Sequence, residues 1–304
     1  MSPFFSVVIP TYNRCELLKR AIHSVEKQSF KDYEIIIIDN NSTDETHDYL
    51  KTKKNIIYKK INNNGVIAKS RNLGIEISKG QWVSFLDTDD TWFEQKLEET
   101  FKEIKKSNFD IICNNEWVID NIRSKKKIWN YGPYEKNFYK TLLLYGNRNG
   151  TSATSVNKNF LLKNNIKFNE NIEFITAEDY EFFLNIALKG GLFSYLQIPL
   201  GTHLYHEKAE SAKPKRLYDA KMEVLKYHVY SNKSFLKKDK LWKKICKINA
   251  IKSLISSFIQ TRDFLKLVNI MYKILGAPLE SFIIFNFLIK KTIKQNNLKK
   301  KYAL

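Results

Sequence analysis

The chain has 304 residues, of which 43% are apolar, 13% are aromatic and 27% are charged. This composition is that of a globular protein, and the length allows one large core or two smaller ones. Together they exclude a small binding module and favour an enzyme-sized α/β domain with an extension.

The net charge of +19 is concentrated towards the C-terminus. Residues 213–304 hold 22 Lys and Arg against 5 Asp and Glu, whereas residues 1–212 hold 29 against 27. This asymmetry predicts a near-neutral domain followed by a basic region that contacts a polyanion, either nucleic acid or an anionic membrane surface. A solvated, lysine-rich helical surface is the alternative.

Cysteine usage and apolar runs indicate the compartment. Cys15, Cys113 and Cys246 lie far apart, with no CxxC pair and no histidine at metal-ligand spacing, so we expect no disulfide or zinc site and a reducing cytosol. The first residues are typical of a β-strand and not of a signal peptide. The longest apolar run, residues 282–289, is far shorter than the ~20 residues that span a bilayer, so any membrane contact should be peripheral.

The first half alternates short β-branched runs with helical patterns, which predicts βαβ units and a largely parallel sheet. The predicted strands are 5–9, which Pro10 ends, 33–38, 56–59 and 82–86. The predicted helices are 16–27, a segment towards Lys51 that Ser42 or Thr43 caps, and 67–78.

The middle of the chain, residues 93–202, has a mixed pattern. It predicts a helix up to Lys106, a strand at 109–113, a polar passage at 146–150 and a helix that begins near Ala177. Beyond Lys213 apolar faces alternate with lysine clusters, so we expect helices there.

Polar residues follow three of the predicted strands. Ligands of open α/β sheets bind outside the carboxyl ends of the strands. The segment 11–14, Asp39 and the segment 87–90 all fall at that edge. We therefore expect three segments, far apart in the sequence, to meet in one crevice.

The acidic cluster Asp87, Asp89 and Asp90 follows a buried strand. Carboxylates held this close raise one another's pKa, and a divalent cation removes that cost. Mg²⁺ and Mn²⁺ prefer oxygen ligands and commonly bridge carboxylates to substrate phosphates. Taken alone, the cluster is equally compatible with an exposed acidic turn at a helix N-terminus.

Five segments resemble, in order and spacing, the motifs of family 2 glycosyltransferases. They are VVIPTYNR (7–14), IIIIDNNSTDET (35–46), NNGVIAKSRNLGI (63–75), GQWVSFLDTDDTW (80–92) and AEDYEFFLNIALKGG (177–191). The resemblance covers about residues 4–211. It implies an inverting enzyme with the GT-A fold, Rossmann-like with a mostly parallel central sheet. A nucleotide-sugar-binding half (1–100) and an acceptor-binding half (101–212) would precede a helical, basic C-terminal region (213–304).

The resemblance also implies roles on the donor side. Asp39 would bind the imide edge of uracil, and Arg71 would reach the ribose or pyrophosphate, since a guanidinium binds phosphate oxygens bidentately. Asp89 and Asp90 would bind Mn²⁺ or Mg²⁺. His206, at the position of a histidine in the family's YRxH motif, would approach the metal or diphosphate. The other residues placed at the nucleotide sugar are Pro10, Thr11, Tyr12, Arg14, Asp87 and Thr88.

On the acceptor side the resemblance implies that Asp179 is the general base, which deprotonates the attacking hydroxyl. Glu178 would orient Asp179 or contact an acceptor hydroxyl, while the metal stabilises the departing diphosphate. The sequence departs from the family at His203 and Leu204, where Tyr and Arg are usual. It departs again at Asn40 and Asn41, where Asp and Gly are common.

The expected activity is transfer of Glc, Gal or an N-acetyl form of either from a UDP-sugar to a saccharide acceptor. The acceptor is expected to be lipid-linked, in surface polysaccharide or glycolipid synthesis, with the enzyme cytoplasmic and peripheral on the inner face of the membrane. A nucleic-acid-binding protein is the alternative, although zinc-finger spacing and an RRM motif are missing. Lysine-rich faces beside apolar stripes fit anionic lipid, so no nucleic-acid partner is expected. A nucleotidyltransferase is disfavoured because the first strand is followed by no Gly-rich phosphate loop.

Overall fold

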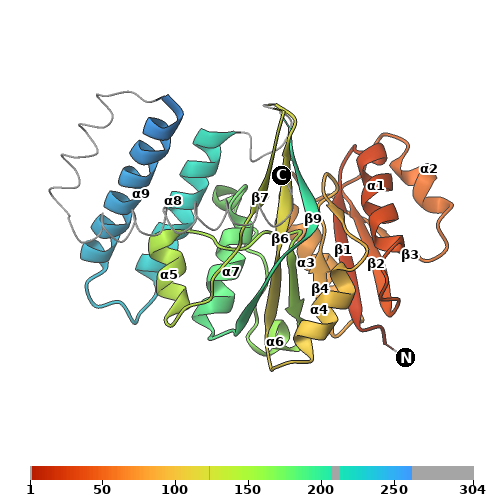
Figure 1. The fold of residues 1–304 in the computed structure, drawn as a ribbon, viewed down its shortest axis with the longest axis horizontal. Helices are drawn as coiled ribbons and strands as arrows, with labels where there is room; N and C mark the ends of the chain where they lie inside the picture. The colour runs from red at the N-terminus through yellow and green to blue at the C-terminus, as the bar shows by residue number, and fades with distance from the viewer. Residues whose placement is uncertain (1, 123, 207–212, 262–304) are drawn as a thin grey trace. The chain divides into compact units, whose positions relative to one another are not determined.

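The computed structural model describes residues 2–122, 124–206 and 213–261 (Figure 1). By contacts the chain divides into two compact units. The first takes residues up to 136 and from 148 to 224, and the second takes 137–147 and the described residues from 225 onward. The functional division at residues 100 and 212 stays a prediction.

Four parallel strands form one half of the sheet in the first unit. Their spatial order is β3 (Ile56–Lys60), β2 (Tyr33–Asp39), β1 (Phe5–Thr11) and β4 (Trp82–Phe85). Helices α1 (Cys15–Glu26), α2 (Thr46–Lys51) and α3 (Ile67–Ile77) connect them. Every residue of β1 and β4 is buried, which explains why these strands appear in the sequence as apolar runs without strict alternation.

Successive side chains of β1 point to opposite faces of the sheet, and helices cover both of these faces. Val7 and Ile9 pack in one core with Leu18 and Ile22 of α1. Val8 faces α3, where a Cβ added at Gly74 would lie 2.2 Å from Val8 Cγ1. The close approach of α3 to β1 therefore depends on this glycine.

The other half of the sheet is mixed. β8 (Thr154–Asn157) lies antiparallel between β4 and β6 (Ile111–Asp120), and β6 pairs in parallel with β9 (Phe193–Tyr205). β7 (Lys125–Trp129) and β5 (Thr91–Trp92) are antiparallel to β6 and β9, which completes a nine-stranded sheet. The helical segments here are α4 (Lys96–Ile104), α6 (Lys158–Lys163), the 3-10 turn η1 (Ile172–Phe174) and α7 (Glu178–Leu188).

Two local predictions were wrong. β1 continues through Pro10 to Thr11, because beyond Val8 only β2 pairs with it and a strand with one open side tolerates a missing N–H. α2 begins at Thr46 without a side-chain cap. Ser42 does not cap it because its hydroxyl donates to Asp39 instead.

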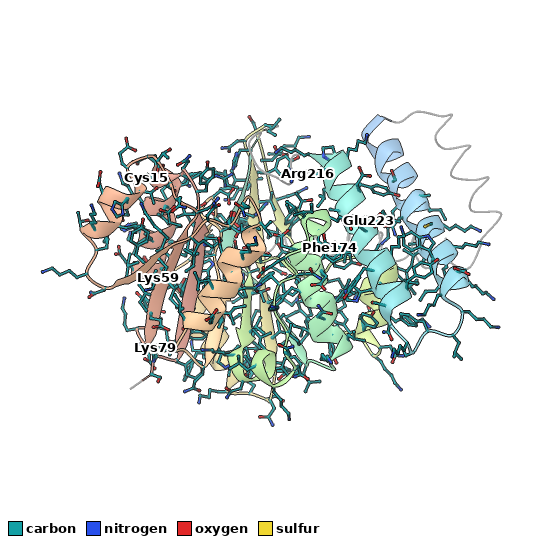
Figure 2. All side chains as sticks on the ribbon, turned by 180° about the vertical axis from the view of Figure 1, so that it is seen from behind. Cys15, Lys59, Lys79, Phe174, Arg216 and Glu223 are labelled. Carbon is teal, nitrogen blue, oxygen red and sulfur yellow. The ribbon has the colours of Figure 1, made fainter. Side chains whose placement is uncertain are left out.

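The outer strand β3 ends the sheet on one side. Lys59 and Lys60, at its C-terminal end, are exposed, and Figure 2 labels Lys59 on this strand. Lysines on an edge strand discourage pairing with a strand of another chain.

The described residues of the second unit are mainly helical, which confirms the prediction of helices beyond Lys213 as far as residue 261, whereas α5 (Phe138–Tyr145) was not predicted. The unit contains α5, the second part of α8 (Pro214–Ser231) and α9 (Lys238–Thr261). Its buried apolar side chains include Leu142, Leu143, Val229, Ile245, Ile248 and Ile251. None of the helices in the described ranges is both long and apolar enough to cross a bilayer. The run 282–289 and the basic residues after 261 lie outside the described residues.

Candidate active site

The carboxyl ends of β1, β2 and β4 meet at one edge of the sheet, as expected. Thr11 pairs with Asp39 at the ends of β1 and β2. The backbone N–H of Asn13 donates to Ser42 Oγ at 2.9 Å, and Arg14 Nη1 lies 3.1 Å from Asp89 Oδ2. The three segments 11–14, 39–42 and 87–90 therefore line a common site.

Asp39 is fully buried and held in a fixed orientation. Its Oδ1 accepts the backbone N–H of Ser42 at 2.9 Å and the Ser42 hydroxyl at 2.5 Å, while Oδ2 accepts the Tyr58 hydroxyl at 2.9 Å. A carboxylate offers about four acceptor positions, and the chain fills three of those on Asp39.

The other residues of the predicted nucleotide pocket differ in exposure. Pro10 and Thr11 are buried, whereas the side chain of Tyr12 is 53% exposed, as a group that stacks on a ligand would be. Asn41, at a position where the family has glycine, has φ of 53°. Asparagine tolerates the left-handed region better than most residues other than glycine.

Arg71 joins two parts of the chain 107 residues apart. It is 3% exposed, and it donates from Nη2 to Asp87 Oδ1 at 2.8 Å and from Nη1 to Glu178 Oε1 at 2.7 Å. Burial alone would lower its pKa, but Asp87 and Glu178 raise it, so the guanidinium stays charged. The sequence predicted a phosphate contact for Arg71 and missed this bridge from Asp87 to Glu178.

A strained turn precedes the pair Glu178 and Asp179. Ile175 has φ −54° and ψ 129°, Thr176 has φ 81°, and the N–H of Ala177 donates to Phe174 O at 2.8 Å. These values define a type II turn, whose third position favours glycine because of its positive φ. A β-branched threonine there is an outlier of the kind found beside functional sites.

Asp179 lies in the first turn of α7. Burial, and then the negative charge of Glu178, raise the pKa of its carboxyl to about 7, while Arg71 acts in the opposite direction. A carboxyl with a pKa near neutrality can take up and release a proton at physiological pH, as a general base must.

Asp89 and His206 bring together an oxygen and a nitrogen donor. His206 Nε2 lies 3.2 Å from Asp89 Oδ2, the oxygen that Arg14 also contacts. Burial raises the pKa of Asp89, and Asp90 and Asp87 raise it further. Carboxylate oxygen suits both Mn²⁺ and Mg²⁺. Within the described ranges no three acidic, histidine or cysteine side chains gather as metal ligands, so substrate phosphates would have to complete the coordination of a cation.

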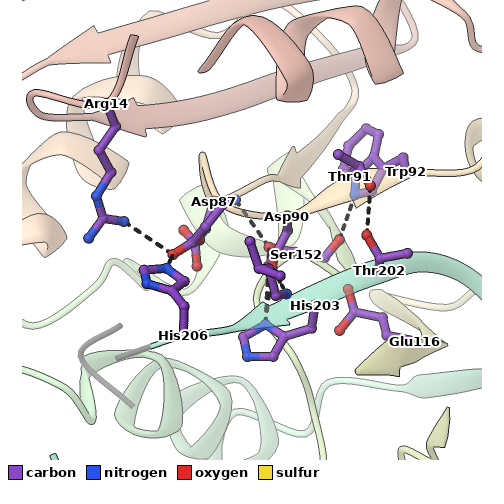
Figure 3. Close-up of polar contacts among 12 residues, drawn as sticks. Arg14, Asp87, Asp90, Thr91, Trp92, Glu116, Ser152, Thr202, His203 and His206 are labelled. Carbon is purple, nitrogen blue, oxygen red and sulfur yellow. Dashed lines mark hydrogen bonds and ion pairs between the residues drawn. The ribbon is translucent and has the colours of Figure 1, made fainter. Parts of the chain in front are cut away.

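Asp90 points away from this pair, into the protein (Figure 3). It accepts hydrogen bonds from Ser152 Oγ at 2.5 Å and from the N–H of Leu204 at 3.0 Å, and it pairs with His203. Burial would lower the pKa of His203, but Asp90 and Glu116 raise it to about 10. Thr88, between Asp87 and Asp89, is buried.

Sequence reasoning missed the buried polar groups of β6 and the side chains that contact them. Lys96 is fully buried and donates to Asn114, and burial lowers its pKa to about 8. Burial and the charge of Asp90 raise the pKa of Glu116 to about 7, and Glu116 accepts the Tyr131 hydroxyl at 2.9 Å. The available signal was the polar run 114–116 directly after the apolar residues 111–113.

Comparison with known proteins identifies the family of the chain. Residues 6–166, more than half of the chain, match the family described as "Glycosyl transferase family 2". The poly(ribitol-phosphate) beta-N-acetylglucosaminyltransferase TarP of Staphylococcus aureus is 35% identical over 201 residues, 62% of this chain and 59% of that protein. The chain thus spans less than two thirds of that relative's length.

Two further proteins are similar. The UDP-Glc:alpha-D-GlcNAc-diphosphoundecaprenol beta-1,3-glucosyltransferase WfaP of Escherichia coli is 32% identical over 192 residues, 61% of this chain and 70% of that protein. The crystal structure of S. aureus TarS residues 1–349 with UDP-GlcNAc superposes with a TM-score of 0.63 at 18% identity, covering 89% of this chain and 79% of the other. The family match and the shared GT-A fold establish that the chain belongs to glycosyltransferase family 2.

Proposed function

We propose that the protein is an inverting glycosyltransferase that moves a hexose from a UDP-sugar to a saccharide acceptor. The observation that carries the proposal is the Arg71 bridge, which holds Asp87 at the donor side and Glu178 beside the base Asp179. The buried guanidinium of Arg71 thus connects the donor side of the site to the side that carries the base.

The donor would lie along the ends of β1, β2 and β4. The remaining acceptor position on Asp39 Oδ2 fits the imide N–H of uracil, and the exposed ring of Tyr12 offers an apolar face. The names of the two relatives mention UDP-Glc in one case and N-acetylglucosaminyl transfer in the other. We therefore propose a UDP-linked Glc, Gal or N-acetyl form of either sugar.

Asp179 would act as the general base. It takes the proton of the acceptor hydroxyl as that oxygen bonds to the anomeric carbon from the face opposite the diphosphate. The bond from the anomeric carbon to the diphosphate oxygen breaks, and UDP leaves with the electron pair of that bond. Glu178, held by Arg71, fixes the start of α7 and so the position of Asp179.

The residues at the acidic turn fit a divalent cation, because Asp89 and His206 present one oxygen and one nitrogen in a buried, negatively charged setting. They would hold Mn²⁺ or Mg²⁺, which supplies positive charge for the departing diphosphate. Arg14, which contacts Asp89, adds a fixed positive charge on the same side.

The acceptor is proposed to be lipid-linked, as the name of the E. coli relative states for that enzyme. The basic region 213–304 would then rest on the anionic inner face of the cell membrane, with the protein cytoplasmic and peripheral. Neither the family nor the relatives' names support the nucleic-acid alternative. Residues 1–100 would bind the nucleotide sugar and residues 101–212 the acceptor.

The test is release of UDP by the purified full-length chain across a panel of UDP-sugars, first after EDTA treatment and then with added Mn²⁺ or Mg²⁺. We expect one UDP-sugar to be hydrolysed slowly without acceptor, with activity lost in EDTA and restored by either metal. GDP- and ADP-sugars serve as matched controls for the Asp39 contact. Preference for a purine donor would contradict the uridine assignment, and full activity in EDTA would contradict the metal assignment.

A further inference from the structure

We propose that Asp90 is a positioning residue and not a metal ligand: its carboxylate fixes the end of β9 so that His206 faces Asp89. The inference rests on the proposed function in one respect: binding of a metal is the reason why His206 must face Asp89. It replaces the earlier assignment of Asp90 to the metal.

The hydrogen-bonding capacity of Asp90 is already used within the chain. Oδ1 accepts the backbone N–H of Leu204 at 3.0 Å, and Oδ2 accepts the Ser152 hydroxyl at 2.5 Å. His203 Nδ1 lies 3.2 Å from Oδ1 and 3.3 Å from Oδ2. Both oxygens of Asp90 already face these donors, so a cation could bind there only by displacing them. Asp89, one residue earlier, has contacts with Arg14 and His206 alone among the described side chains.

Ser152 connects Asp90 to the rest of the acidic turn. Its hydroxyl accepts the N–H of Asp87 at 3.1 Å while it donates to Asp90, and the N–H of Asp90 donates to the carbonyl of Asp87 at 3.0 Å. The Ser152 carbonyl accepts from Trp92 Nε1 at 2.8 Å. The turn that carries Asp89 is thus closed on itself and attached to the loop before β8.

The same carboxylate attaches this turn to β9. His203 is held between Asp90 and the ring of Trp129, on which it stacks at a centroid distance of 5.1 Å and an interplanar angle of 19°. Leu204, bonded through its N–H, lies only two residues before His206. Asp90 therefore holds both the turn that carries Asp89 and the end of β9 that carries His206. Figure 3 shows its contacts with Ser152 and His203.

The test compares Asp90→Asn with Asp89→Asn, Ser152→Ala and the double variant Asp90→Asn/Ser152→Ala. Asparagine has a single acceptor oxygen, so in Asp90→Asn either the N–H of Leu204 or the hydroxyl of Ser152 loses the oxygen to which it donates. With UDP present, Mn²⁺ affinity measured by electron paramagnetic resonance should fall about 10-fold for Asp90→Asn, as expected for one or two lost hydrogen bonds. It should fall more than about 100-fold for Asp89→Asn, because a ligand itself is lost.

The double variant should bind Mn²⁺ about as well as Asp90→Asn alone, since residues of one network act non-additively. Asp110→Asn is the matched control, because this carboxyl also accepts a backbone N–H, that of Leu192, but next to the opposite end of β6, and it should leave the affinity unchanged. If Asp90 were a ligand, Asp90→Asn would lose as much affinity as Asp89→Asn, and the effect of Ser152→Ala would simply add to it.

A second readout needs no metal and so separates this inference from the proposed function. Amide hydrogen exchange of the peptide that contains residues 202–206 should become faster in Asp90→Asn and stay unchanged in Asp89→Asn. Unchanged exchange in Asp90→Asn would overturn the inference, whatever the enzyme's activity. Absence of Mn²⁺ binding by the unmodified protein, together with this exchange pattern, would instead overturn only the metal part of the proposed function.

Discussion

Asp39 and Asp179 are both carboxyl groups at the edge of one domain, yet their surroundings favour different chemical roles. Asp39, at the end of β2, accepts three hydrogen bonds from Ser42 and Tyr58, which fix it as an acceptor. Asp179, at the start of α7, lies beside Glu178, and burial raises its pKa to about 7. Carboxyls whose environments differ in this way take different roles, and the proposed roles here are a fixed recognition group for Asp39 and a base for Asp179.

The largest expected effect is on Asp179→Asn, which tests the base side of the comparison. Turnover should fall by about 10²- to 10⁴-fold because the amide cannot take the proton. The affinity for UDP, measured by calorimetry, should stay within about 2-fold of the original value, since Asp179 does not touch the nucleotide in this scheme. The melting temperature at pH 8 should not decrease, because the variant removes a buried charge.

Asp39→Asn is the matched change on the recognition side. It should raise KM for the UDP-sugar by about 10-fold and leave turnover at saturating donor nearly unchanged, because it removes binding and not chemistry. Loss of donor affinity in Asp179→Asn with normal turnover would reverse the two assignments.

The pH dependence sharpens the comparison. A base must be deprotonated, so kcat/KM should rise with pH and level off above a midpoint near 7, the pKa of Asp179 in the folded protein. Glu178 helps to raise that pKa, so Glu178→Gln should move the midpoint to lower pH. A midpoint that stays in place, in initial rates measured from pH 5 to 9, would remove the coupling between the two carboxyls from the mechanism.

The smallest expected effect concerns the turn before Asp179. Thr176→Gly relieves a φ of 81° in a β-branched residue and should raise the free energy of unfolding by about 0.5 to 1 kcal/mol in urea titrations. Thr52→Gly, at a φ of −78°, is the matched control and should lower it. A loss of stability in Thr176→Gly would show that the side chain, and not the backbone, decides this position.

The sequence was sufficient for the parallel half of the fold. Strands β1 to β4 and helices α1 and α3 lie within one or two residues of their predicted bounds, because strands buried on both faces appear as apolar runs. The predicted strand ends likewise indicated that the segment 11–14, Asp39 and the segment 87–90 meet at the site, since the carboxyl ends of parallel strands share one edge.

The mixed half was mostly beyond sequence reasoning. β6 continues past its apolar start through the buried residues 114–116, and β8 consists of Thr154, Ser155, Val156 and Asn157. Such strands lack an apolar pattern because their polar groups are paired inside the protein, which local periodicity cannot detect. For the same reason the sequence could not predict that Asp90 would meet Ser152 and His203, residues 62 and 113 positions away.

The place of β8 between β4 and β6 also has a consequence for biosynthesis. β4 ends at Phe85, but its antiparallel neighbour begins about 70 residues later, at Thr154. At about 5 to 20 residues per second, a ribosome takes about 4 to 14 s to make the intervening chain. During that time the outer backbone groups of β4 have no strand to pair with, which makes this edge the point at which partly made chains can associate.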